Sequence, residues 1–149
     1  MTKEEAFSKL LKYCSYQERC HEEVRSKLLS LKIYGNDLEN VISKLIENDF
    51  LNEERFANAY AGSKFRQLGW GRTKILHQLK ARKISDYCIK EAMKEIQPEE
   101  YLRILKQNIE KKILQLGKDA NRLDKIARYL AGKGFEPELV WRELKEIKK

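Results

Sequence analysis

The part of the sequence with the clearest chemical character is a basic stretch at residues 64–83. It contains seven Lys and Arg residues and no acidic residue: Lys64, Arg66, Arg72, Lys74, Lys80, Arg82 and Lys83. Such a stretch creates a local positive field whatever its fold, which suits the phosphates of a nucleic acid or an acidic protein groove. We take these seven residues as the candidate contact residues. The alternative is that they only solvate helix surfaces.

Two further features bear on binding. A second basic region, residues 103–133, has nine Lys and Arg against three acidic residues, and there we favour the plain surface role. Tyr60, Phe65 and Trp70 lie near the first stretch and are candidates for stacking on nucleobases. For Phe65 and Trp70 we favour packing inside the protein instead, because aromatic side chains bury large apolar areas.

Residues with the spacing of a catalytic, metal or cofactor site are not apparent. The sequence has no phosphate-binding glycine loop, no HExxH pattern and no nucleophile elbow. His77 has no partner three or four residues away that would form a catalytic dyad. The three cysteines, Cys14, Cys20 and Cys88, form no CxxC pair and accompany only two histidines. We expect no enzyme, no cofactor, no metal site and no disulfide.

The composition indicates a folded basic protein. The 149 residues carry a formal net charge of +8, with 36% charged and 42% hydrophobic residues, which is too apolar for a disordered basic tail. No apolar run exceeds three residues, far below the roughly 20 that a membrane span needs. The first residues also lack the apolar core of a secretory signal. We expect a cytoplasmic protein without a membrane partner.

Hydrophobic periodicity predicts helices throughout. Apolar residues recur at i, i+3 and i+4 in one segment after another, and the few glycines and prolines lie mainly at the ends of these segments. The predicted caps and first-turn residues are Ser15 with Glu18, Asn36 or Asp37, Asn52, Ser85, Pro98 and Pro137. The sequence therefore predicts an all-α fold with about nine helices.

An internal repeat sets the expected organisation. Leu28, Leu79 and Leu130 are spaced by 51 residues, and six neighbouring positions keep the same register in all three copies. Of these 21 positions only Glu143 is not apolar. We expect three tandem three-helix repeats, at residues 1–47, 48–97 and 98–149, in an elongated and curved array that is monomeric. The alternative is a chance spacing of similar amphipathic helices.

Three groups of residues together resemble the RecX family of regulatory proteins, which modulate the bacterial recombinase RecA. They are Val24–Leu28 with Gly35, Asp49–Ala57 with Tyr60, and Arg66 with Gly69, Gly71, Ile75 and Leu79. The order and spacing of these groups, over nearly the whole chain, carry the resemblance.

The resemblance implies a non-enzymatic partner of the RecA filament that lodges in its helical groove. Family members mostly inhibit the recombinase, ATPase and coprotease activities of RecA, and they also bind single- or double-stranded DNA without sequence preference. The implied processes are DNA recombination, DNA repair and the SOS response. The family's basic middle-repeat surface corresponds here to the seven residues of the basic stretch.

Two other functions stay open at this point. A helical DNA-binding protein that acts through nucleic acid alone would use residues 72–82 as a recognition helix. A scaffold would use its repeats to bind another polypeptide.

Overall fold

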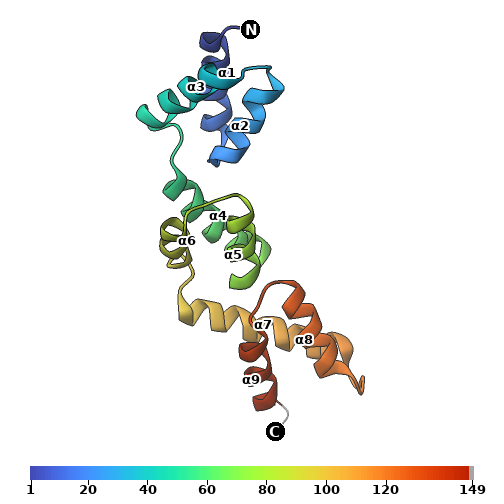
Figure 1. Cartoon of the computed structure of the whole chain (residues 1–149). Helices are drawn as coiled ribbons and strands as arrows, with labels where there is room; N and C mark the ends of the chain where they lie inside the picture. The colour runs from blue at the N-terminus through green and yellow to red at the C-terminus, as the bar shows by residue number, and fades with distance from the viewer. Residues whose placement is uncertain (148–149) are drawn as a thin grey trace. The chain divides into compact units, whose positions relative to one another are not determined.

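The computed structural model describes residues 1–147, and every regular element in this range is a helix (Figure 1). These residues form nine helices: α1 (Lys3–Tyr16), α2 (His21–Ser30), α3 (Gly35–Glu47), α4 (Glu53–Leu68), α5 (Arg72–Ala81), α6 (Asp86–Met93), α7 (Pro98–Leu116), α8 (Arg122–Gly132) and α9 (Pro137–Ile147). No strand occurs between residues 1 and 147. The expected all-α fold with about nine helices is confirmed.

Several helices begin where the sequence predicts. The side chain of Asn52 accepts a hydrogen bond from a backbone amide three residues on, at 2.9 Å, where α4 begins. Ser85 makes the equivalent bond at 3.3 Å at the start of α6. Pro98 and Pro137 occupy the first positions of α7 and α9, where an amide hydrogen has no partner in the helix.

Two predicted helix starts are wrong. α1 extends past Ser15 to its end at residue 16, so Ser15 caps no helix. The carboxylate of Glu18, its predicted capping partner, instead accepts from the guanidinium of Arg55 at 2.5 and 2.7 Å. α3 begins before the predicted caps Asn36 and Asp37. Glu18 therefore forms an ion pair with a residue that is distant in the sequence, instead of the predicted helix cap.

The turn that follows α2, α5 and α8 has the same backbone geometry each time. Lys32, Lys83 and Gly134 hold the left-handed conformation, with φ of +62°, +60° and +99°. The next amide donates to a carbonyl five residues earlier in all three: Ile33 to Leu28 at 3.0 Å, Ile84 to Leu79 at 3.2 Å and Phe135 to Leu130 at 3.0 Å. The 51-residue register of the sequence thus recurs in the local backbone.

By its contacts the chain divides into two compact units. The first unit comprises Met1–Ala59 and Leu79–Ala92, and the second comprises Tyr60–Gln78 and the chain from Met93 onward. Helices α4 and α5 contribute residues to both units. The three-repeat boundaries, and the elongated curved array, stay predictions.

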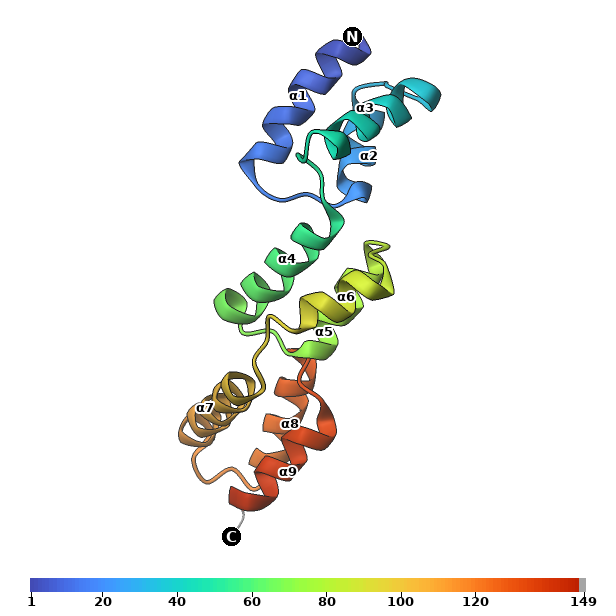
Figure 2. The same ribbon diagram turned by 90° about the vertical axis from the view of Figure 1, so that its left-hand side faces the viewer.

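The core of the first unit lies where the repeat register places it. Helices α1, α2 and α3 pack against one another (Figures 1 and 2). Their shared core consists of Ala6, Leu10, Cys14, Val24, Leu28, Leu38, Val41, Ile42 and Leu45, joined by Ile33 and Leu51 from the following turns. Cys14 and Cys88 are buried free thiols, as expected for cysteines that pack like small hydrophobic residues.

The core of the second unit is built mainly by α7, α8 and α9, which pack against one another (Figure 2). Their fully buried side chains include Tyr101, Leu105, Ile109, Ile126 and Leu130, and Phe135 from the turn between α8 and α9 is buried with them. Phe65 is 2% exposed and its ring lies 5.8 Å from that of Tyr101, so the predicted packing role of Phe65 is confirmed. Tyr101 also stacks on Phe135, with ring centroids 5.1 Å apart.

Candidate basic–aromatic interface

The structure distributes the seven predicted contact residues between the two units. The second unit contains Lys64, Arg66, Arg72 and Lys74, and the first contains Lys80, Arg82 and Lys83. The residues differ in whether their charged groups pair with a carboxylate or lie against an aromatic ring.

In the second unit, the indole of Trp70 gathers two lysines from different helices. Trp70 lies in the turn between α4 and α5, and the Nζ atoms of Lys64 and Lys74 lie 5.4 and 4.4 Å from its ring centroid. The Tyr60 ring meets the same indole edge to face, with ring centroids 6.3 Å apart, and Lys64 Nζ lies 5.2 Å from the Tyr60 ring centroid. Cation–π attraction holds both ammonium groups in place without neutralising them.

A second aromatic ring in the same unit gathers two more lysines. Lys112 Nζ, from α7, lies 4.0 Å from the ring centroid of Tyr129, and Lys133 Nζ lies 5.8 Å from it. The Lys133 ammonium also lies beside Gly69, where the Cβ of any larger residue would stand 3.2 Å from it. Gly69 adjoins Trp70 in the chain, so the two lysine pairs are neighbours.

We call this surface the lysine–aromatic strip and define it as Lys64, Trp70, Lys74, Lys112, Tyr129 and Lys133. Within residues 1–147, none of its four lysines forms an ion pair with a carboxylate. Four uncompensated ammonium groups beside exposed parts of aromatic rings favour an anionic partner. Sequence reasoning missed Lys112, Tyr129 and Lys133, because no spacing in the sequence connects them to Trp70.

The turn that carries Trp70 is held by a close approach of two backbone segments. The amide of Gly71 donates to the carbonyl of Lys133 at 2.8 Å, and the amide of Thr73 donates to that of Gly134 at 2.9 Å. A Cβ at Gly71 would overlap the backbone of Gly134 and the residue after it, and one at Gly134 would overlap Lys74. Glycine is needed at both positions because no side chain fits between the two segments.

Arg72, whose predicted contact role stays a prediction, also makes contacts inside the second unit. Its Nη1 atom lies 3.1 Å from the Glu136 carboxylate, and its guanidinium carbon lies 3.9 Å above the centroid of the Tyr101 ring. Its backbone amide donates to the Tyr101 hydroxyl at 3.0 Å, and that hydroxyl donates to Glu136. Burial, and then the bond to Glu136, raise the pKa of Tyr101 far above its usual value. We call these three residues the Tyr101 clasp.

The other predicted residues are more exposed. Arg66 lies on the surface of α4, with its guanidinium folded against Gly62 one turn earlier. In the first unit, Lys80 is exposed and Lys83 Nζ lies 3.9 Å from a carboxylate oxygen of Glu22. Lys83 is thus partly neutralised, whereas the strip lysines are not.

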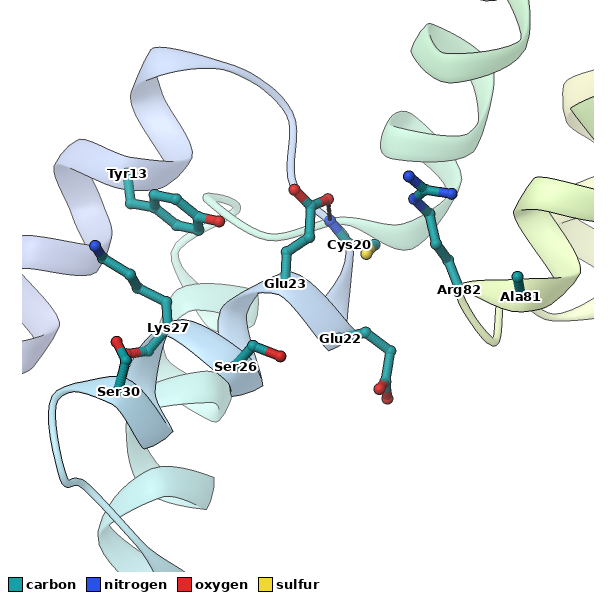
Figure 3. A pocket seen from close by; sticks show the side chains of 9 residues that line it. All are labelled: Tyr13, Cys20, Glu22, Glu23, Ser26, Lys27, Ser30, Ala81 and Arg82. Carbon is teal, nitrogen blue, oxygen red and sulfur yellow. Dashed lines mark hydrogen bonds between the residues drawn. The ribbon is translucent and has the colours of Figure 1, made fainter.

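Arg82 lines a hollow of about 530 Å³ between α2 and the end of α5 (Figure 3). Glu22, Glu23 and Lys27 line the same hollow, so charges of both signs meet there. One oxygen of Glu23 accepts from the amide of Cys20 at 3.1 Å, and the other lies 3.7 Å from Arg19. Burial raises the pKa of Cys20 to about 11, which disfavours a reactive thiolate in this hollow.

Residues 1–147 contain neither a metal cluster nor a membrane-spanning helix. No group of three or more His, Cys, Asp or Glu side chains in that part of the chain is arranged to hold a metal ion. None of the described helices is both long enough and apolar enough to cross a membrane.

The fold and the strip define an all-α protein that assembles a basic, aromatic-lined surface from short helices and tight turns. A family model for the second three-helix domain of RecX matches residues 52–93. The regulatory protein RecX of Bacillus velezensis is 34% identical over 88 residues, and that of Bacillus subtilis is 30% identical over 105 residues. The match covers 59% and 70% of this chain, but it spans only 34% and 40% of the two Bacillus proteins.

The crystal structure of RecX from Lactobacillus salivarius extends the similarity to nearly the whole chain. It superimposes with a TM-score of 0.87 at 26% identity and covers 98% of this chain and 96% of that one. The chain belongs to the RecX family of regulatory proteins.

Proposed function

We propose that this chain regulates RecA by binding the RecA filament on DNA in the filament's helical groove, and that it lowers the recombinase, ATPase and coprotease activities of RecA. Membership of the RecX family supports the choice of partner. The observation that supports the proposed contact surface is the lysine–aromatic strip. In it, two aromatic rings lie against four lysines, and no described carboxylate forms an ion pair with them.

The physical mechanism is binding at several modest contacts along a polymer. A chain of three repeats that lies along the groove makes its second and third contacts intramolecularly, so weak contacts combine into useful affinity. The strip lysines accelerate association with an anionic surface and make binding sensitive to salt. We place the protein in the cytoplasm as a monomer, where it acts without a cofactor or a catalytic residue.

The DNA-only alternative has less support. A recognition helix aims its first residues at base edges, yet Arg72 at the start of α5 is held by Glu136 and Tyr101. Lys74 is likewise held by Trp70. These contacts favour binding to a charged backbone or protein surface over base-specific readout.

The test of the proposed function is RecA ATP hydrolysis on single-stranded DNA, with this protein added at substoichiometric ratios. We expect wild type to inhibit and Lys64→Glu/Lys74→Glu to need at least a tenfold higher concentration, because both changes reverse charges in the strip. The matched control is Lys9→Glu/Lys12→Glu, which makes the same charge change on exposed residues of α1. It should inhibit like wild type.

Two outcomes would contradict this proposal at different points. Absence of inhibition together with absence of co-sedimentation with the filament would remove RecA as the partner. Equal inhibition by both double variants would leave RecA as the partner but place its contacts away from the strip.

Direct binding to DNA gives a second prediction. If the four strip lysines each neutralise one phosphate of a single strand, the logarithm of the association constant should fall against the logarithm of salt with a slope of roughly −3. Lys64→Glu/Lys74→Glu should flatten the slope to about half. Fluorescence anisotropy of a labelled oligonucleotide, at salt concentrations from about 50 to about 200 mM, measures the slope for wild type and for the double variant. A slope near zero would exclude phosphate contacts by the strip.

A further inference from the structure

A second surface of the second unit has the opposite charge character. Helices α7 and α9 pack through buried residues, and beside this contact lies a groove of about 570 Å³. α7 presents Lys106, Glu110, Ile113 and Leu114 to it, and α9 presents Glu143, Glu146 and Ile147. These positions follow the i, i+4, i+7 and i, i+3, i+4 spacing of single helix faces, so two faces meet across the groove.

The lining of this groove includes apolar side chains that the fold leaves accessible. Leu114 is 83% exposed and Ile147 is 38% exposed. Isolated exposed leucines are common on protein surfaces. Here Ile113, Leu114 and Ile147 converge on one hollow, which is the arrangement that marks an interaction site.

Glu143 makes the groove unusual for this chain. It occupies the register position that holds the buried Val41 and Ala92 in the other two copies, and it is the only charged residue among the 21 repeat positions. Its side chain is only 13% exposed, and its carboxylate lies 3.9 Å from Lys106 Nζ. Among the described residues that line the groove, Glu110, Glu143 and Glu146 oppose one lysine, Lys106, in a protein whose net charge is +8.

The shape of the surface indicates an elongated occupant. A second hollow of about 430 Å³ continues along α7 and shares Lys106 and Glu110 with the groove. From Glu99 to Leu114 the two hollows follow α7 for about 22 Å at the helical rise per residue. A helix laid beside α7 matches this length better than a compact ligand does.

We propose that the groove between α7 and α9 binds an amphipathic α-helix of another polypeptide, with aliphatic residues that enter the hollow and Lys or Arg residues that face Glu143 and Glu146. The acidic rim disfavours nucleic acid and anionic lipid surfaces, which carry charge of the same sign. The site is separate from the lysine–aromatic strip, and its test requires neither RecA nor DNA.

The probe is a fluorescein-labelled amphipathic peptide made of Leu and Lys, titrated with the full chain and followed by anisotropy. We expect saturable binding that Leu114→Asp weakens at least tenfold, because it places a negative charge among the apolar residues that line the groove. Glu143→Val restores the apolar repeat register, so it should fold and still weaken binding at least tenfold. The matched control Leu29→Asp changes a 48% exposed leucine in the first unit and should bind like wild type.

Three results would overturn the proposal. The first is failure of the Leu/Lys peptide to bind. The second is equal binding to wild type, Leu114→Asp and Glu143→Val. The third is self-association of the wild type in sedimentation velocity that Leu114→Asp abolishes, because a second copy of the chain would then be the occupant. If the protein does not inhibit RecA but still binds the peptide, the proposed function is contradicted and the groove proposal is not.

Discussion

Gly71→Ala is expected to lower the free energy of unfolding of the second unit by about 3 to 5 kcal/mol, from overpacking together with two lost hydrogen bonds. The added Cβ would overlap the backbone of Gly134 and Phe135, which cannot turn aside as a flexible side chain can. To make room, the two backbone segments must separate and give up the bonds from Gly71 and Thr73 to the opposing carbonyls. Few single substitutions outside a core cost this much.

Thermal and urea unfolding followed by circular dichroism measure this loss, and hydrogen exchange of α5, α8 and α9 locates it. Gly132→Ala is the matched control, since nothing lies within 4 Å of the position that its Cβ would occupy. That change should be neutral or stabilise slightly, by up to about 1 kcal/mol, because alanine favours a helix. If Gly71→Ala and Gly132→Ala unfold at the same temperature and urea concentration, the close approach of the two segments does not stabilise the unit.

Arg72→Glu is expected to destabilise the second unit by about 2 kcal/mol, the range for a hydrogen bond to a charged group. The change removes the 3.1 Å contact with Glu136 and the position over the Tyr101 ring, and it places two carboxylates side by side. Because the two side chains remain 32% and 30% exposed, solvent screens the repulsion and limits the loss.

The charge-swapped variant Arg72→Glu/Glu136→Arg distinguishes an internal role from a contact role. If the Tyr101 clasp explains Arg72, the swap should recover a large part of the lost stability in urea unfolding. Arg128→Glu makes the same substitution at an exposed position of α8 in the same unit and should alter stability by less than about 0.5 kcal/mol. If Arg72→Glu is fully stable and yet abolishes RecA inhibition, Arg72 contacts the filament directly.

The helices and their buried faces were predictable because the pattern that encodes them is local. Leu28, Leu79 and Leu130 share one register in the sequence, and all three are fully buried. Asn52 and Ser85 cap helices as predicted, because their partners are amides three residues away. Such interactions depend only on neighbours in the chain.

Sequence reasoning could not identify ion pairs between residues that lie far apart in the chain, and one predicted helix cap is wrong for that reason. Glu18 has the spacing of a capping residue, but Arg55, 37 residues away, takes its carboxylate. The bond from the guanidinium of Arg72 to Glu136, 64 residues away, was likewise not predictable from the sequence, whereas the contact role of Arg72 stays a prediction. An ion pair between distant residues leaves no periodicity in the sequence, so no local pattern reports it.

By itself, the sequence determined that this protein is helical, basic and repetitive, and which of its segments carry the charge. Only the tertiary structure decided which charges face outward. It brought Lys112 and Lys133 to Tyr129, beside the turn where Trp70 holds Lys64 and Lys74. The physical reason is that helix formation depends on neighbours within about four residues, whereas a binding surface depends on how distant helices pack.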